Sequence, residues 1–410
     1  MIKTTKEYIN ENWKNTIRYP GTEGDGSWFK MPVPYTTPCA STLFKNFFYW
    51  DTYFANLGLM EDGYEEQAKN NLITMRHFIK ILGFVPNADH IITRSQPPLF
   101  TRGVYDYYHK TGDIGFVKES LFAIEREFGF FQSDRMTKIG LNAYGNNELN
   151  FGKKWYYSEF DRRLGGYTDD EQKIPNNRLI DGLLAIAESG WDFNPRFKRK
   201  GNRFAAGDFV HLDLNCILFD AEVKAAELFA LGGEKEKSEK YREAALKRKN
   251  LIEKYMYDES KGIYLDYDFV TESKSEVVSA ASFYPYALGI SSDKVGCKKV
   301  LEKLELPFGL AACEYRGENE KYWQWDYPSM WPTNVYFAYL ALKNCGLNED
   351  ADRIAKKYMR TVDNCFEKTG DLWEKYDAKK ACVSVTREYD TPEMMGWTAG
   401  VYRFLQEEYE

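Results

Sequence analysis

Apolar residues recur at α-helical spacing along most of this chain, and this periodicity constrains the fold more than any other feature. In the run EVKAAELFAL at 222–231, the apolar side chains fall on one helical face. The pattern predicts helices at 3–15, 51–82, 97–112, 115–132, 177–189, 211–231, 233–256, 276–290, 294–305, 329–345, 348–366 and 392–408, with two helices inside 51–82.

Glycine, proline and small polar residues mark the predicted helix ends. Two glycines at 232–233 indicate a helix stop. The tripeptide TPE at 391–393 is typical of a helix start, with an N-cap, a first-turn proline and an acid facing the helix dipole. Short extended segments are predicted near 262–268 and 372–388. Because no Pro/Ser-rich linker divides the chain, we expect a single all-α domain over residues 1–410.

Paired helices joined by irregular, polar and aromatic loops can close into a ring or stack into an open solenoid. Solenoids carry repeats of about 20–50 residues, and no signature recurs here at a fixed period. We therefore predict a closed (α/α)6 barrel, a toroid of six helical hairpins in which the inner helices converge on a central pit.

The charge distribution argues against several classes of partner. The 410 residues include 62 Asp+Glu and 55 Lys+Arg, for a net charge of -7, and the basic residues are scattered. No basic stripe is available to neutralise a phosphate backbone, so we expect no nucleic-acid partner. The N-terminal run MIKTTKEYINENW has no apolar core, and no stretch approaches the ~20 apolar residues that span a bilayer. We expect no membrane contact.

The seven cysteines are widely spaced and contain no CxxC pair. Neither a disulfide framework nor a zinc site has this pattern. We therefore expect them to be reduced and buried, in a cytoplasmic protein.

The sequence lacks the common signatures of metal and nucleotide chemistry. Its four histidines form no HExxH or other close pair, and neither GxGxxG nor GxxxxGK[ST] occurs. The Gly-x-Ser-x-Gly turn of serine hydrolases is missing as well. We therefore predict no metal and no cofactor, and we look to carboxylates for the chemistry.

Aromatic residues are abundant, at 30 Tyr, 27 Phe and 10 Trp, and many stand beside carboxylates or amides in predicted loops. A sugar requires this combination, because its hydroxyls take hydrogen bonds while its C–H face lies on a ring. Taken singly, each cluster also fits a helix cap or a core aromatic. The clusters are Tyr49-Trp50-Asp51, Asn87, Arg94-Ser95-Gln96, Glu188-Ser189-Gly190-Trp191-Asp192, Trp323-Gln324-Trp325-Asp326, Glu374-Lys375-Tyr376-Asp377 and Arg387-Glu388-Tyr389.

Glycoside cleavage uses two carboxyl groups, one as acid and one as base or nucleophile. Asp192 follows the predicted helix stop at Gly190 and stands beside Trp191, an apolar neighbour of the kind that keeps an acid protonated. A helix-capping role for Asp192 fits the sequence equally well. Glu374 and Glu388 both lie in predicted loops and are rival bases, and either also fits a surface acid.

Six motifs, in order along the chain, resemble the trehalase family, glycoside hydrolase family 37, and its relatives in family 63. The runs FYWDTY at 48–53, GFVPN at 83–87 and RSQPP at 94–98 are similar to the family's "YYWDSY" and "GFIPN…RSQPP". The later matches are SGWD at 189–192, QWDYP at 324–328, EKYD at 374–377, and EY at 388–389 with GWT at 396–398.

The resemblance implies an (α/α)6 barrel and an inverting mechanism. It also implies that Asp192 is the general acid and Glu374 the general base, and that Glu388 contacts substrate. For inversion, the two carboxyl groups stand roughly 6.5–9.5 Å apart. The chain departs from the family where "PGGRFRE" would precede the first motif, so that Leu43 replaces a sugar-binding arginine. The "RPESY" element corresponds to Arg163 and its neighbours, and the glycine run before EY is absent.

We therefore predict an exo-acting, inverting glycoside hydrolase that splits a small α-glucoside such as trehalose. One alternative is a mannosylglycerate or glucosylglycerate hydrolase, in which Arg163, Arg387 or Lys45 would bind the acidic aglycone. Another is a barrel that binds sugar without turnover. The predicted catalytic pair is Asp192 and Glu374. The predicted substrate-binding residues are Trp50, Asp51, Asn87, Arg94, Ser95, Gln96, Arg163, Gly190, Gln324, Trp325, Asp326 and Glu388.

Overall fold

The computed structural model describes residues 3–24, 26–40, 44–148, 160, 176–199, 203–318, 322–384, 391–393 and 396–409, and of 176–178 and 203 the backbone alone.

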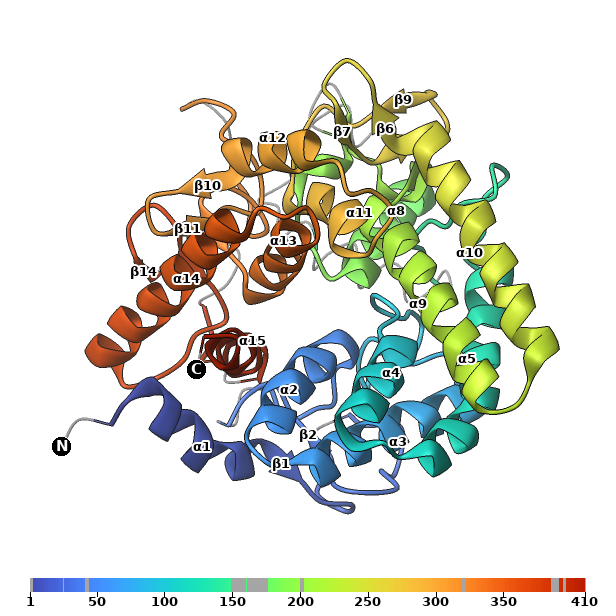
Figure 1. Cartoon of the computed structure of the whole chain (residues 1–410), viewed down its shortest axis with the longest axis vertical. Coiled ribbons are helices and arrows are strands. Elements are labelled where there is room, and N and C mark those ends of the chain that lie inside the picture. Colours follow the sequence, from blue (N-terminus) through green and yellow to red (C-terminus); the bar gives the residue numbers. More distant parts are fainter. Residues whose placement is uncertain are drawn as a thin grey trace.

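Six of the described helices contact one another in a closed ring (Figure 1). In ring order they are α2 (Tyr49–Glu61), α4 (Phe100–Thr111), α9 (Leu212–Leu231), α11 (Tyr284–Ala287), α13 (Pro332–Asn344) and α15 (Gly396–Glu407). The last of them, α15, packs back on the first, α2. This closure confirms the predicted helical barrel, because the first and last helices of an open solenoid stay apart.

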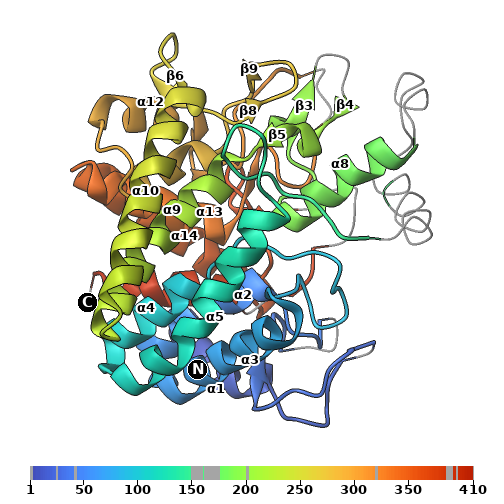
Figure 2. The same cartoon turned by 90° about the vertical axis from the view of Figure 1, so that its right-hand side faces the viewer.

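A second layer of helices surrounds this ring in Figure 1. It consists of α1 (Thr5–Thr16), α3 (Glu65–Leu82), α5 (Ile114–Ser133), α10 (Lys235–Met256), α12 (Lys294–Leu304) and α14 (Asn348–Thr369). The remaining described helix, α8 (Asn176–Ser189), extends along one end of the barrel (Figure 2).

The two layers follow from the sequence of each helix. In α2, every residue from Tyr49 to Met60 is buried, as a helix enclosed on all sides requires. The outer helix α14 instead buries one stripe, which includes Ile354, Tyr358 and Val362, and exposes charged residues on its other face. Amphipathic helices therefore cover a ring of more fully buried ones.

Two glycines let the ring close. A Cβ atom at Gly400 of α15 would lie 1.8 Å from the carbonyl oxygen of Phe54 in α2, and one at Gly58 would lie 2.9 Å from the Cα of Gly400. Real Cβ atoms do not approach other atoms so closely, so glycine is required where the two backbones meet.

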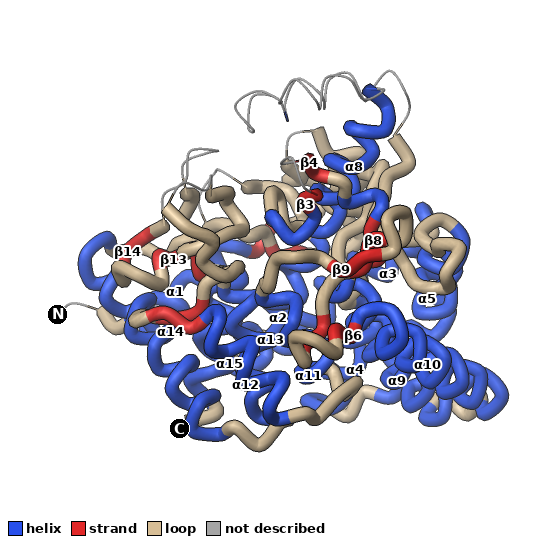
Figure 3. Tube along the Cα trace, turned by 90° about the horizontal axis from the view of Figure 1, so that it is seen from above, coloured by secondary structure: helices blue, strands red, loops and turns tan. Residues whose placement is uncertain are grey.

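The described strands are two residues long and pair in antiparallel ladders. Figure 3 shows β3, β4, β8, β13 and β14 toward one end of the barrel, where loops join the helices. The expected extended segments near 262–268 and 372–388 are confirmed by β7, β8, β13 and β14. The pairs are β1 (Ile17–Arg18) with β2 (Tyr35–Thr36), β3 (Lys198–Arg199) with β4 (Arg203–Phe204), β5 (Phe209–Val210) with β8 (Tyr267–Asp268) and β9 (Ser273–Lys274), β6 (Tyr257–Asp258) with β7 (Ile263–Tyr264), β10 (Glu305–Leu306) with β11 (Gly309–Leu310), and β12 (Ser329–Met330) with β13 (Tyr376–Asp377) and β14 (Cys382–Val383).

The predicted helices depart most from the structure in two segments. The segment 276–290 forms only a 3-10 turn, Ala280–Phe283, followed by the single turn α11. The last helix begins at Gly396, so Thr391 and Pro392 do not cap it. Instead the Pro392 carbonyl accepts a hydrogen bond from the Glu374 backbone, and Glu393 forms a β-bridge with Trp373. Pairing with this distant segment competes with helix formation at 391–393.

All seven cysteines are free, and six of them are buried as expected. Cys382 is exposed, which corrects that expectation, because it lies in the short edge strand β14. Within the described ranges, no helix is both long and apolar enough to cross a membrane.

Candidate active site

Two predicted substrate-binding residues, Trp50 and Asp51, lie in the first turn of α2. Both side chains are buried. The backbone N–H of Trp50 donates a hydrogen bond to Gln96 Oε1 at 3.1 Å. This bond joins the FYWDTY and RSQPP motifs, which are separated in sequence by a whole helical hairpin.

A buried carboxylate holds the RSQPP motif in place. Glu188, near the end of α8, accepts hydrogen bonds from Ser95 N at 2.8 Å and Gly145 N at 2.6 Å. Its two oxygens also receive Arg135 Nε at 2.7 Å and Nη2 at 2.9 Å. The glutamate and the arginine are both buried, so this pair fixes the loop from inside the protein.

The predicted residues Asn87, Arg94 and Ser95 surround the same turn and are buried. The Asn87 N–H donates to the Arg94 carbonyl at 2.8 Å. The Ser95 hydroxyl donates to the Val85 carbonyl at 2.7 Å. The hydroxyl of Ser95 therefore has a structural partner within its own loop.

The segment that carries Asp192 turns sharply at the end of α8. Gly190 has a φ of 76°, a left-handed conformation that favours glycine. A Cβ atom at this position would lie 2.7 Å from Cζ2 of Trp50. The turn thus passes directly over the Trp50 ring, followed by the fully buried Trp191 and the half-buried Asp192. The predicted stop of this helix at Gly190 is confirmed.

Five buried tryptophans bring the motifs together. Trp325 stacks on Trp331 with ring centroids 3.7 Å apart, and it contacts Trp191 at 5.1 Å and Trp50 at 5.5 Å. Trp397 packs edge-on against Trp50 at 5.9 Å and against Trp331 at 5.7 Å. We call these five residues the tryptophan cluster. It joins motifs that are spread over most of the chain.

Glu374 adjoins this cluster. Its backbone carbonyl accepts the indole N–H of Trp397 at 3.0 Å. Its carboxylate Oε2 lies 2.9 Å from Nζ of Lys375, and both side chains are buried. Lys375 in turn lies over the Trp331 ring, with Nζ 5.1 Å from the centroid.

The electrostatics link Asp51 to Glu374. Burial raises the pKa of Asp51 to about 7. A hydrogen bond from the backbone of Asp51 lowers this pKa, and the negative charge of Glu374 raises it. A carboxyl group that exchanges a proton near neutral pH therefore lies close to the proposed base. Perturbed carboxyl groups of this kind are typical of active sites.

The QWDYP motif divides between the tryptophan cluster and a supporting ion pair. Asp326 is fully buried, and its two oxygens receive Arg316 Nη1 at 2.8 Å and Nη2 at 2.7 Å. The same carboxylate accepts the backbone N–H groups of Trp323 at 3.2 Å and Tyr327 at 2.7 Å. Gln324 is buried, and its backbone carbonyl accepts the Trp331 indole N–H at 3.3 Å. In this arrangement, Asp326 holds the loop that presents Trp325.

Some predicted residues lie outside the described ranges, namely Arg163, Glu388, Leu43 and Arg387. Sequence reasoning also missed functional neighbours of the site. The motifs by themselves indicate no role for Arg135, Arg316 or Lys375. Lys375 lies within the EKYD motif, and Glu188 directly precedes the SGWD motif. For Glu188, the available signal in the sequence was a carboxylate directly beside a motif. Its partner Arg135 lies 53 residues away in the sequence, and no local pattern marks that pairing.

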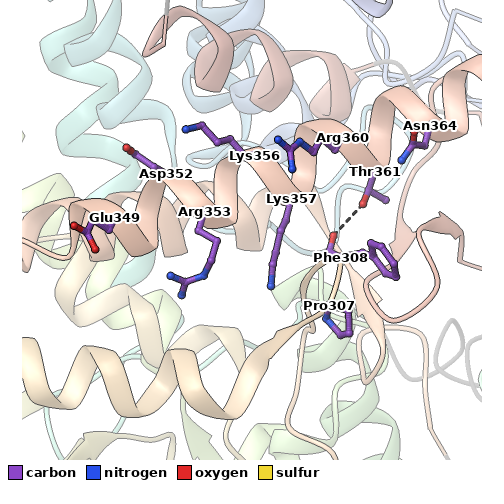
Figure 4. Close-up of a pocket in the computed structure, with 10 residues that line it drawn as sticks. All are labelled: Pro307, Phe308, Glu349, Asp352, Arg353, Lys356, Lys357, Arg360, Thr361 and Asn364. Carbon is purple, nitrogen blue, oxygen red and sulfur yellow. Dashed lines mark hydrogen bonds between the residues drawn. The ribbon is translucent and has the colours of Figure 1, made fainter.

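A separate groove of about 590 Å³ runs along the outer face of α14 (Figure 4). Two of its basic side chains, those of Arg353 and Lys357, each bind Glu305 at 2.7 Å. No predicted site residue is among the described residues that line it. We therefore locate the candidate active site at the tryptophan cluster and not in this groove.

Comparisons with known proteins find solved structures of similar fold. Neutral trehalase Nth1 from Saccharomyces cerevisiae superposes with a TM-score of 0.74 at 22% identity, over 100% of this chain and 81% of that one. GH63 mannosylglycerate hydrolase from Thermus thermophilus, in complex with glucose, gives 0.67 at 15% identity, over 97% of this chain and 98% of that one. A bacterial glucoamylase complexed with acarbose gives 0.55 at 12% identity, over 89% and 49%.

These structural likenesses show a shared fold. The family is shown by the sequence, since the family model described as trehalase matches residues 1–410. The chain therefore belongs to the trehalase family and is a glycoside hydrolase.

Proposed function

We propose that this protein is an exo-acting, inverting hydrolase of a small α-glucoside such as trehalose. The observation that carries the proposal is the tryptophan cluster. The segment of Asp192 contacts it through Trp191, and the segment of Glu374 contacts it through Trp397. Two carboxyl groups on separate segments beside one aromatic wall suit a sugar held between an acid and a base.

In the proposed reaction, Asp192 gives a proton to the glycosidic oxygen as the bond to the anomeric carbon breaks. Glu374 takes a proton from a water molecule whose oxygen attacks that carbon from the opposite face. The products are two sugars, one with its anomeric configuration inverted. Buried Trp50, Asp51, Asn87 and Arg94 are proposed to surround the nonreducing sugar, with Glu388 and Arg163 completing the site.

A second substrate class is supported by one neighbour, whose structures bear the name mannosylglycerate hydrolase. Of the charged residues predicted to bind an acidic aglycone, Lys45 lies in the described part of the chain, and it is exposed. It is therefore accessible to a carboxylate at the protein surface. Trehalose remains the first candidate because the family model and the neighbour with the higher TM-score both carry the name trehalase.

The experiment is an incubation of the purified protein with trehalose, other α-linked glucose disaccharides, mannosylglycerate and glucosylglycerate, with the first product followed by proton NMR. From trehalose, we expect α- and β-glucose to appear in equal initial amounts, because the attacked carbon is inverted while the leaving glucose keeps its α configuration. Asp192→Asn and Glu374→Gln should each lower kcat by roughly 100-fold or more, because each removes one proton-transfer group. Glu259→Gln, at an exposed position in the turn between β6 and β7, is the matched control and should retain activity.

The alternatives give distinct results. Initial release of α-glucose alone from trehalose, without β-glucose, would contradict inversion, and cleavage of the glycerate substrates alone would select the acidic aglycone. Binding of sugar with no cleavage of any substrate would indicate a barrel without turnover. We extend the proposal to one catalytic domain over residues 1–410 and to a cytoplasmic location, which the free cysteines favour.

A further inference from the structure

Lys375 combines full burial with a direct contact to the proposed base. Its side chain is 0% exposed, and Nζ lies 2.9 Å from Oε2 of Glu374. Burying an ammonium group costs free energy that a hydrophobic side chain in the same place would not. Such a group is therefore a candidate for a role beyond packing.

The position of the ammonium group is fixed on two sides. The Glu374 carboxylate lies on one side, and the face of Trp331 lies 5.1 Å away on another. The Trp331 ring is held in place, because it stacks on Trp325 at 3.7 Å within the tryptophan cluster. Cation–π attraction adds to the ion pair at a desolvated site of this kind.

The backbone of Lys375 is fixed as well. Its carbonyl accepts the Ser384 N–H at 3.3 Å. The next two residues form β13, which pairs with β12 on one side and β14 on the other. The lysine therefore holds the Glu374 carboxylate against a rigid frame.

Two other titratable groups in the described part of the chain interact with Glu374, and both are acidic groups. Asp51 of α2 and Cys39, from the segment before it, both interact electrostatically with Glu374. Burial raises the pKa of both, to about 7 for Asp51, so that near neutral pH Cys39 is uncharged and Asp51 is partly protonated. Across the site, α15 presents the uncharged Trp397 to the Glu374 backbone. Lys375 brings a positive charge into direct contact with the Glu374 carboxylate.

We infer that Lys375 is a positioning residue for the base, holding the Glu374 carboxylate oriented toward the attacking water. This inference rests on the proposed function of Glu374. An opposite charge within about 4–6 Å favours the charged form of a carboxylate. A single contact to one oxygen also restricts its rotation. Lys375 itself exchanges no proton with the substrate.

The test uses α-D-glucopyranosyl fluoride beside trehalose, because fluoride needs little help from an acid to leave. Asp192→Asn should therefore retain activity on the fluoride, while Glu374→Gln should lose it. Lys375→Met should lower kcat on both substrates by roughly 10- to 100-fold. It should also move the low-pH limb of the pH–kcat profile upward, because the charge that pairs with the carboxylate is removed. KM should change little.

Two further variants separate positioning from folding. Lys375→Arg keeps the charge and should restore the low-pH limb while kcat stays reduced, because the planar guanidinium does not reproduce the point contact. Lys379→Met, at an exposed lysine in the turn after β13, should match the wild type in kcat and pH profile. Thermal melting of each variant reports whether it is folded.

A folded Lys375→Met protein with wild-type kcat and pH profile would overturn the inference. If that variant does not fold, the ¹⁵N resonance of Lys375 Nζ, assigned by its loss in Lys375→Arg, decides the question. It should shift in Glu374→Gln, and an unmoved resonance would overturn the inference. If the wild type cleaves neither the fluoride nor any substrate of the panel, the proposed function fails instead.

Discussion

Gly190 is a single residue on which the geometry of the acid loop depends. Its positive φ turns the chain at the end of α8, and its missing side chain lets that turn lie against Trp50. The residue thus sets how close the segment of Asp192 comes to the first turn of α2. The left-handed backbone and the close contact with Trp50 both depend on Gly190, and a matched pair of variants can separate these two effects.

Gly190→Ala should destabilise the protein and impair catalysis. The left-handed backbone costs an alanine about 1–2 kcal/mol, and the new Cβ would meet Trp50 Cζ2 at 2.7 Å. Because misplacement of about 1 Å can cost 100-fold in rate, kcat/KM should fall by roughly 10- to 100-fold. Gly233→Ala is the control, since Gly233 has a φ of 87° and a Cβ atom added there would meet no described atom within 4 Å. Equal losses in both variants would show that contact with Trp50 is unimportant.

At the scale of secondary-structure elements, the site is assembled from helix ends and loops held by buried polar groups. Glu188 links α8 to the RSQPP loop and to Arg135, which follows α5. Arg196 plays a similar part behind Trp191. Its guanidinium lies 4.6 Å from that ring and binds Asp213 at 2.8 Å and Asp266 at 2.9 Å. Rigid elements thus support the loops that present the candidate catalytic groups.

Glu188→Gln should destabilise the protein by about 3–5 kcal/mol, because it leaves Arg135 unpaired in the interior and sets an NH2 group against backbone N–H donors. Urea unfolding at pH 7 measures the effect. Glu239→Gln removes the carboxylate of an exposed pair with Arg242 and should change stability by less than about 0.5 kcal/mol. A similarly small change for Glu188→Gln would mean that the buried pair does not hold these elements together.

At the scale of the whole molecule, the closed barrel buries carboxyl groups in its interior. Glu127 of α5 is buried and accepts the Tyr49 hydroxyl of α2 at 2.7 Å. Burial raises the pKa of Glu127 to about 8, and the hydrogen bond from Tyr49 only partly opposes this. The native state therefore holds a proton on Glu127 that the unfolded chain releases.

Native Glu127 binds its proton more tightly than the unfolded chain does, so its contribution to stability is present below pH 4.5 and is lost as pH rises to about 8. The loss should amount to a few kcal/mol. Glu127→Gln cannot ionise, so its free energy of unfolding should fall less than that of the wild type between pH 5 and 8. Urea unfolding at several pH values measures the difference between the two curves. Parallel curves would contradict the assignment.

The sequence by itself determined the helical class, most helix boundaries and the motifs of the site. These follow from local causes, namely apolar spacing, glycine stops such as Gly190 and residue types adjacent in the chain. Only the tertiary structure decided what lies next to what. The closure of α15 on α2, the pairing of residues 391–393 with the Glu374 segment, and the contact of Arg135 with Glu188 join positions that are separated in sequence. Such contacts depend on packing in space, which no local pattern encodes.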